Sequence, residues 1–196
     1  MNLADKVTSL RLILAPFFFI LYLFPEMGLF SWVSDDLRWT VPVLWVLFIL
    51  SEITDLLDGK IARARHEVSD FGKLFDPFAD VLVRITYFLC FVIDGILPAL
   101  LFLVVLYREF GIQFLRNLML KKGVVLGARK GGKLKAVTYM LAGAVALLAA
   151  SAARFELDDA VILPLRTGAV VIFLISVVIS VISFIDYVSV YNKTGK

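Results

Sequence analysis

The sequence has only one cysteine and one histidine among its 196 residues. A lone cysteine excludes an intramolecular disulfide and a thiolate metal site, and Cys90 lies in an apolar run where a buried, unreactive thiol is expected. His66 stands in a short polar stretch, so we interpret it as a solvated loop residue. The chain also has no GxGxxG motif, no Walker loop and no HExxH motif, which removes the usual signatures of dinucleotide, nucleoside triphosphate and zinc sites.

What the chain has in excess is apolar sequence. Hydrophobic residues make up 61% of it and the mean hydropathy is +0.91, whereas a soluble domain has roughly 45–50% apolar residues. We expect an all-α integral membrane bundle forming a single domain over residues 1–196, with no cleavable signal peptide and no internal repeat. Six transmembrane helices are predicted, over residues 7–25, 40–61, 73–93, 96–119, 134–153 and 165–190.

The net charge is only +3, but its distribution is uneven. The connections near residues 26–39 and 154–164 are rich in Asp and Glu, and most of the Lys and Arg residues fall near the other helix ends. The positive-inside rule then places both termini on the cytoplasmic side of the cell membrane. We expect membrane lipid, and no nucleic acid, as a partner of this chain.

Four carboxylates form the most informative pattern. Asp55 and Asp58 are three residues apart, and Asp76 and Asp80 are four apart, so each pair shares one face of its helix. If the two helices are neighbours, the four carboxylates converge near the cytoplasmic membrane surface. Four negative charges in an apolar setting require a cation, and clustered oxygen ligands suit Mg²⁺ or Mn²⁺.

The same stretch resembles the signature of the CDP-alcohol phosphatidyltransferase family: Asp55-x2-Asp58-Gly59-x2-Ala62-Arg63-x8-Gly72-x3-Asp76-x3-Asp80. The resemblance implies a six-helix membrane enzyme, commonly a homodimer. It implies transfer of the phosphatidyl group of CDP-diacylglycerol to an alcohol, with release of CMP. It also implies that one or two divalent ions, Mg²⁺ or Mn²⁺, are bound by the four Asp residues.

The resemblance assigns further roles at the site. Asp80 is implied to be the catalytic general base for the acceptor hydroxyl, Gly59 to pack against the cytidine, and Arg63 to contact the donor phosphates. The residues implied to bind CDP-diacylglycerol are Asp5, Thr8, Gly59, Ala62, Arg63, Ser69 and Gly72.

The rest of the chain resembles the bacterial branch of this family whose acceptor is glycerol 3-phosphate. The similarity extends over Thr8-x2-Arg11 with Pro16, Arg108-Glu109, Arg116 and Gly132-Lys133-x-Lys135, although Val81 and Ala136 stand where that branch commonly has Lys and Thr. A basic pocket would offset the repulsion between the acceptor phosphate and the donor pyrophosphate. The predicted acceptor-phosphate residues are Arg108, Arg116, Lys133 and Lys135, with Arg129 and Lys130 as outer candidates.

Several alternatives stay open at this point. A sister enzyme with the same chemistry would use inositol phosphate or serine as its acceptor, and a divalent-cation transporter or a non-catalytic lipid-binding homologue would use the same carboxylates differently. A further alternative is that the basic residues only set topology or attract anionic lipid. Glu52 and Arg84 lie within apolar spans one turn from Asp55 and Asp80, and we interpret them as residues that orient these carboxylates.

Overall fold

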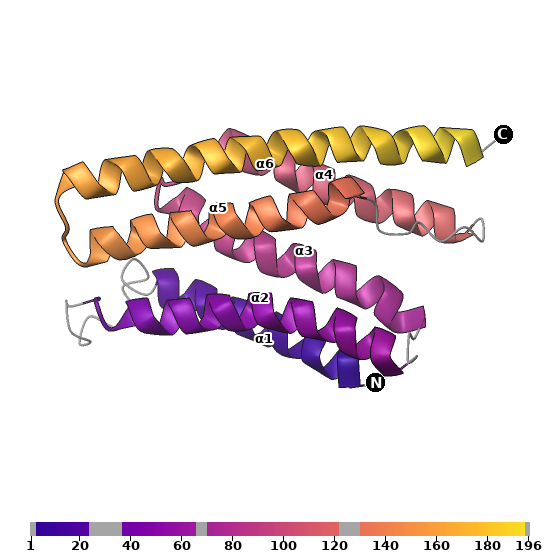
Figure 1. Cartoon of the computed structure of the whole chain (residues 1–196), viewed down its shortest axis with the longest axis horizontal. Coiled ribbons are helices and arrows are strands. Elements are labelled where there is room, and N and C mark those ends of the chain that lie inside the picture. The colour runs from indigo at the N-terminus through magenta and orange to yellow at the C-terminus, as the bar shows by residue number, and fades with distance from the viewer. Residues whose placement is uncertain (1–2, 24–36, 66–69, 122–129, 195–196) are drawn as a thin grey trace. The chain divides into compact units, whose positions relative to one another are not determined.

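The computed structural model describes residues 3–23, 37–65, 70–121 and 130–194, with side chains at 7–23, 37–55, 72, 75–121 and 134–192. Over these residues the chain forms six α-helices and no strand (Figure 1). The helices are α1 Leu3–Leu23, α2 Thr40–Arg65, α3 Asp70–Ile93, α4 Ala99–Lys121, α5 Lys130–Arg154 and α6 Asp159–Thr194.

The all-α prediction is confirmed for the described residues, and each predicted span coincides with one helix. Two helices are clearly longer than predicted: α2 continues to Arg65 and α6 extends from Asp159 to Thr194, because a helix continues into polar residues that an apolar pattern does not mark. By contrast, α4 begins at Ala99, after the predicted start at residue 96. By length and composition, Leu134–Arg154 and Asp159–Asn192 are able to cross a membrane, and Val7–Leu23 is a shorter apolar helix. Membrane character is therefore supported, while six spans with cytoplasmic termini stay a prediction.

The chain divides into two compact units, so the single domain over residues 1–196 also stays a prediction. The first unit comprises Met1–Ile93 and Ala150–Leu157, and in it α1 packs against both α2 and α3. Aromatic rings from these helices meet edge to face: Tyr22 lies 5.5 Å from Phe91 and Phe48 lies 5.4 Å from Tyr87, between ring centroids. Such pairs add about 0.5–1.5 kcal/mol each beyond their buried area, so they fix how the three helices pack.

The last turn of α5 belongs to this first unit. Arg154 donates a hydrogen bond to the Thr40 hydroxyl at 2.6 Å and another to the Tyr22 carbonyl at 2.7 Å. Its guanidinium also stacks 4.6 Å from the centroid of the Tyr22 ring. One arginine therefore fastens the end of α5 to the adjoining ends of α1 and α2.

The second unit comprises Asp94–Ala149 and Asp158–Lys196, and in it α4 packs against α6. A glycine permits this close approach, since a Cβ at Gly111 would lie only 3.0 Å from the Phe184 ring. Gly95, in the connection before α4, has φ of +66°, a left-handed conformation that glycine adopts without strain.

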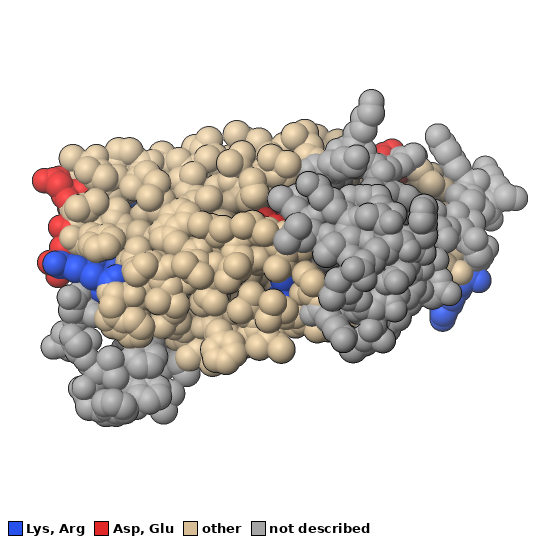
Figure 2. All heavy atoms as spheres, turned by 60° about the horizontal axis from the view of Figure 1, so that its bottom comes forward, with Lys and Arg blue, Asp and Glu red and all other residues tan. Residues whose placement is uncertain are grey.

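Much of the surface is apolar. Phe17, Leu100, Tyr107, Phe114 and Leu163 are each at least 60% exposed. Figure 2 shows that most of the described surface in that view belongs to residues other than Lys, Arg, Asp and Glu, with few charged side chains among them. Large apolar side chains that stay exposed in this number suit contact with lipid rather than water.

Candidate active site

The site lies in the first unit, where α1, α2 and α3 each present polar residues at helical spacing. Thr8 and Arg11 are one turn apart on α1, Glu52 and Asp55 are one turn apart on α2, and α3 carries Asp76, Asp80 and Arg84 at successive intervals of four. Residues at these spacings lie along one face of a helix. Because α1 packs against both other helices, the three polar faces meet inside an otherwise apolar unit.

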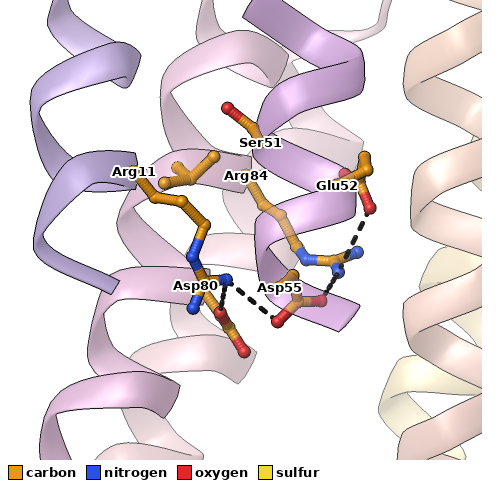
Figure 3. Close-up of a pocket in the computed structure, with 7 residues that line it drawn as sticks. Arg11, Ser51, Glu52, Asp55, Asp80 and Arg84 are labelled. Carbon is orange, nitrogen blue, oxygen red and sulfur yellow. Dashed lines mark hydrogen bonds and ion pairs between the residues drawn. The ribbon is translucent and has the colours of Figure 1, made fainter. Parts of the chain in front are cut away.

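Arg11 is the centre of the site (Figure 3). Its Nη1 atom lies 2.9 Å from Oδ1 of Asp55 and 2.5 Å from Oδ1 of Asp80, so one guanidinium nitrogen donates to carboxylates from two helices. The Arg11 side chain is only 2% exposed, whereas Asp55 and Asp80 are 26% and 33% exposed. The arginine therefore lies beneath the two carboxylates, which keep one side open.

A second arginine approaches Asp55 from α3. Arg84 Nη2 lies 3.4 Å from Oδ2 of Asp55 and 3.8 Å from Oε2 of Glu52, and Glu52 in turn accepts a hydrogen bond of 3.0 Å from the Tyr87 hydroxyl. Charges of opposite sign thus alternate from Glu52 through Arg84, Asp55 and Arg11 to Asp80. This contact supports the interpretation of Glu52 and Arg84 as residues that orient the carboxylates.

The carboxylates border a small open pocket between the helices. Figure 3 shows Arg11, Asp80 and Asp55 converging there, with the second carboxylate oxygen of Asp80 pointing away from Arg11. Its lining consists of Arg11, Ser51, Glu52, Asp55, Asp80, Val83 and Arg84. Next to it, Thr8 donates a hydrogen bond of 2.8 Å to Oδ1 of Asp76, which links the predicted nucleotide border on α1 to the third carboxylate.

The structure thus brings together two of the four predicted metal ligands directly, Asp55 and Asp80, and places Asp76 one helical turn from Asp80. The side chain of Asp58 lies outside the described residues. Among the side chains that are described, no group of three or more His, Cys, Asp or Glu is arranged to hold a metal. The donor chemistry nevertheless fits Mg²⁺ or Mn²⁺, because carboxylate oxygens are hard ligands and the pocket side of Asp80 is open.

Most of the predicted donor-binding residues are described only by their backbone. Asp5 lies in the first turn of α1, and Gly59, Ala62 and Arg63 lie in the last turns of α2, with side chains outside the described set. Gly72 is buried near the start of α3. Ser69 lies outside the described residues, so its role stays a prediction.

The predicted acceptor residues belong to the second unit. Arg108 is 5% exposed and donates to the Ser180 carbonyl at 3.0 Å and to Oε1 of Glu109 at 2.9 Å. Lys135 lies 2.8 Å and 3.0 Å from the two Glu109 oxygens, so Glu109 binds two of the four predicted phosphate ligands, Arg108 and Lys135. The side chains of Lys133 and Lys130 are not among those described, and Arg129 lies outside the described residues.

Arg116 differs from Arg108 in its hydrogen bonds. Its Nε atom is buried and has no hydrogen-bond partner among the described residues, although α4 carries it two turns beyond Arg108. A buried side-chain N–H group without a hydrogen-bond partner is rare, and the Nε atom of Arg166 has the same property among the described residues.

Sequence reasoning did not assign functions to Arg11 and Glu109. Arg11 was named only as part of the motif Thr8-x2-Arg11, and it stands one helical turn from Thr8 on the face that enters the site. Glu109 is an acid inside the apolar helix α4, next to Arg108. In both cases the available signal was an ionisable residue within an apolar span, which is usually paired or functional.

Comparison with known proteins shows the family. The chain belongs to the CDP-alcohol phosphatidyltransferase family, whose sequence profile matches residues 1–185. Enzymes of this family generally use divalent metal ions.

Bacterial relatives extend the similarity over most of the chain. A CDP-diacylglycerol–glycerol-3-phosphate 3-phosphatidyltransferase of Treponema pallidum is 39% identical, covering 97% of this chain and 89% of its own. The protein of the same name from Bacillus subtilis is 34% identical, covering 75% and 77%. A probable phosphatidylglycerophosphate synthase of Mycobacterium tuberculosis is 33% identical, covering 96% and 80%.

Proposed function

We propose that the protein transfers the phosphatidyl group of CDP-diacylglycerol to sn-glycerol 3-phosphate, giving phosphatidylglycerol phosphate and CMP. The observation that carries the reaction class is the convergence of Asp55 and Asp80 from two helices at one open pocket. The names of the three bacterial relatives, which match most of the chain, support glycerol 3-phosphate as the acceptor.

In this reaction a hydroxyl oxygen of glycerol 3-phosphate attacks the phosphorus of the phosphatidyl group. The bond from that phosphorus to the CMP oxygen breaks, and the hydroxyl proton must leave as the new bond forms. Asp80 is proposed to accept that proton, because it lines the pocket and one of its oxygens points away from Arg11, which holds the other. A positioned base contributes about 10²–10⁴-fold to such a step.

One or two divalent ions, Mg²⁺ or Mn²⁺, would be held by Asp55, Asp58, Asp76 and Asp80, and would neutralise the donor pyrophosphate. Thr8 supports this set by holding Asp76 through its hydroxyl, and Arg84 supports it by facing Asp55. The remaining proposed donor contacts are Asp5, Thr8, Gly59, Ala62, Arg63, Ser69 and Gly72.

The acceptor phosphate is proposed to bind Arg108, Arg116, Lys133 and Lys135. Glu109 partly neutralises the charges of Arg108 and Lys135. Its hydrogen bonds also hold these two side chains in place, so they would present a fixed positive charge to the acceptor phosphate. Arg116 has its buried Nε available among the described residues, and a guanidinium matches phosphate oxygens in two-pronged geometry. Arg116 is therefore the residue on which acceptor affinity should depend most.

The proposed setting is the bacterial cell membrane, with a multi-pass homodimer whose active site faces the cytoplasm. Glycerol 3-phosphate is a charged, water-soluble substrate, and the carboxylate site lies on the side where the positive-inside rule places the basic helix ends. CDP-diacylglycerol would enter from the lipid phase with its headgroup at the same surface.

The decisive experiment measures CMP release by purified protein from CDP-diacylglycerol with one acceptor at a time. We expect release with glycerol 3-phosphate, loss of it in chelator, and recovery with Mg²⁺ or Mn²⁺. Faster release with inositol phosphate or serine would assign the chain to a sister enzyme with the same chemistry. No release with any acceptor, from protein that remains folded, would contradict the proposal.

A further inference from the structure

Arg11 has a place that the reaction chemistry alone does not explain. The Arg11 side chain is only 2% exposed, and a single nitrogen of its guanidinium contacts both Asp55 and Asp80. Burying an arginine in an apolar bundle is costly unless it is paired. Two neighbouring carboxylates likewise repel each other unless a cation lies between them. Among the described residues, Arg11 is the cation that joins them.

Asp55 has both of its oxygens facing arginines. Oδ1 accepts from Arg11 at 2.9 Å, and Oδ2 lies 3.4 Å from Arg84. A divalent ion bound to Asp55 needs an oxygen at roughly 2.0–2.1 Å, and would bring a double positive charge next to a guanidinium on the same carboxylate. Like charges at that separation repel, so the ion and Arg11 compete for Asp55 and Asp80.

We propose that Arg11 is the built-in counter-ion of the carboxylate site: it holds Asp55 and Asp80 together by contacting both, and it competes with a divalent ion for their oxygens. The inference rests on the proposed function, because that function requires the ion. Arg11 is thus a positioning residue, which holds the two carboxylates together and at the same time weakens metal binding.

The test is direct titration of the purified protein with Mn²⁺, followed by electron paramagnetic resonance, without substrates. Arg11→Gln removes the competing charge and keeps a polar side chain, so we expect Mn²⁺ to bind roughly tenfold more tightly than in the wild type. Arg11→Lys keeps the charge and should stay within about threefold of the wild type. Arg38→Gln, which alters an exposed ion pair with Glu156, should leave Mn²⁺ affinity unchanged.

Thermal stability provides a second readout. In chelator, Arg11→Gln should unfold at a lower temperature than the wild type, and saturating Mn²⁺ should remove most of that difference, because the ion replaces the missing counter-ion. A variant that can be purified only in Mn²⁺ would support the proposal for the same reason. A variant that does not fold even with Mn²⁺ would contradict it, as would equal or weaker Mn²⁺ binding by folded Arg11→Gln.

These outcomes are separate from those of the proposed function. If the wild type transfers phosphatidyl groups and Arg11→Gln binds Mn²⁺ no more tightly, only the role of Arg11 is wrong. If the wild type binds Mn²⁺ and the affinity rises in Arg11→Gln, but no acceptor releases CMP, the counter-ion role stands and the proposed reaction is wrong.

Discussion

At the scale of single residues, Asp80 is the side chain on which turnover should depend most. Asp80→Asn keeps the shape and the contact with Arg11 but can no longer accept a proton, so we expect CMP release to fall by about 10²–10⁴-fold. Binding of CDP-diacylglycerol should be weakened less, because Asp55, Asp58 and Asp76 remain for the ion. Single-turnover assays together with a donor-binding assay would measure the two effects separately.

Asp58→Asn is the comparison for that experiment. It removes a proposed metal ligand and leaves the proposed base, so donor binding and turnover should weaken together. Near-normal turnover in Asp80→Asn would show that another group accepts the proton.

A second residue-scale prediction concerns the acceptor. Arg116→Ala should lower kcat/KM for glycerol 3-phosphate by about 10–150-fold, because a charge-assisted hydrogen bond to phosphate contributes about 1.5–3 kcal/mol. The loss should appear mainly as a higher KM for the acceptor, with the affinity for CDP-diacylglycerol retained. Steady-state kinetics with each substrate varied in turn would decide this.

The comparison for Arg116 is Lys135→Ala, which removes the hydrogen bonds from Lys135 to Glu109 and leaves the one from Arg108. It should raise the acceptor KM and also lower the unfolding temperature, whereas Arg116→Ala should affect the kinetics alone. Unchanged acceptor kinetics in both variants would mean that these basic residues only set topology.

The carboxylates illustrate what the sequence is able to predict at this scale. Spacings of three and four predicted that each Asp pair would share one face of its own helix, because helical periodicity fixes the direction of a side chain. That Asp55 and Asp80 meet was expected only if the two helices were neighbours. Nothing in that periodicity reveals that a guanidinium from α1 lies between them. How the helices pack determines which residue pairs with a buried charge. The periodicity of a single helix does not contain that information.

At the scale of helices, Arg154 is predicted to stabilise the packing of α5 against α1 and α2. Arg154→Ala removes hydrogen bonds to Thr40 and to the Tyr22 carbonyl, and the stacking on the Tyr22 ring. Since a hydrogen bond to a charged group contributes about 1.5–3 kcal/mol, we expect a loss of roughly 2–4 kcal/mol and a clearly lower unfolding temperature in detergent. Thermal unfolding monitored by circular dichroism would measure it.

Arg38 provides the matched control at the same end of the unit. Its ion pair with Glu156 joins side chains that are 48% and 80% exposed, and exposed pairs contribute only about 0–1 kcal/mol. Arg38→Ala should therefore shift the unfolding temperature little. Equal destabilisation by the two variants would show that Arg154 has no special role in holding α5.

The sequence predicted where the helices form, but not which helices contact one another. The predicted span 134–153 falls within α5, because its apolar residues are continuous, but Arg154 was assigned only to the acidic loop side. Its contacts with α1 and α2 connect residues more than a hundred positions apart in the sequence. Apolar periodicity predicts that a helix forms and leaves open which helix it meets.

At the scale of the whole molecule, the six-span topology is the prediction that the described helices leave to experiment. Two helices pass a length and apolarity test, while α2, α3 and α4 carry ionisable residues such as Glu52, Arg84 and Arg108 within their apolar stretches. Those residues are paired in the structure, which lowers the cost of placing them in a bilayer.

Single-cysteine labelling tests the topology, because the only native cysteine, Cys90, is fully buried. Lys121 at the end of α4 and Asp158 just before α6 are both exposed and flank α5, whose 25 residues span about 37 Å at 1.5 Å per residue, enough to cross a bilayer. An impermeant maleimide should label Asp158→Cys in right-side-out vesicles and Lys121→Cys in inside-out vesicles, since basic helix ends stay in the cytoplasm. The unsubstituted protein should remain unlabelled in both preparations. Labelling of both variants from the same side would mean that α5 does not cross the membrane, and the cytoplasmic location of the carboxylate site would lose its main physical support.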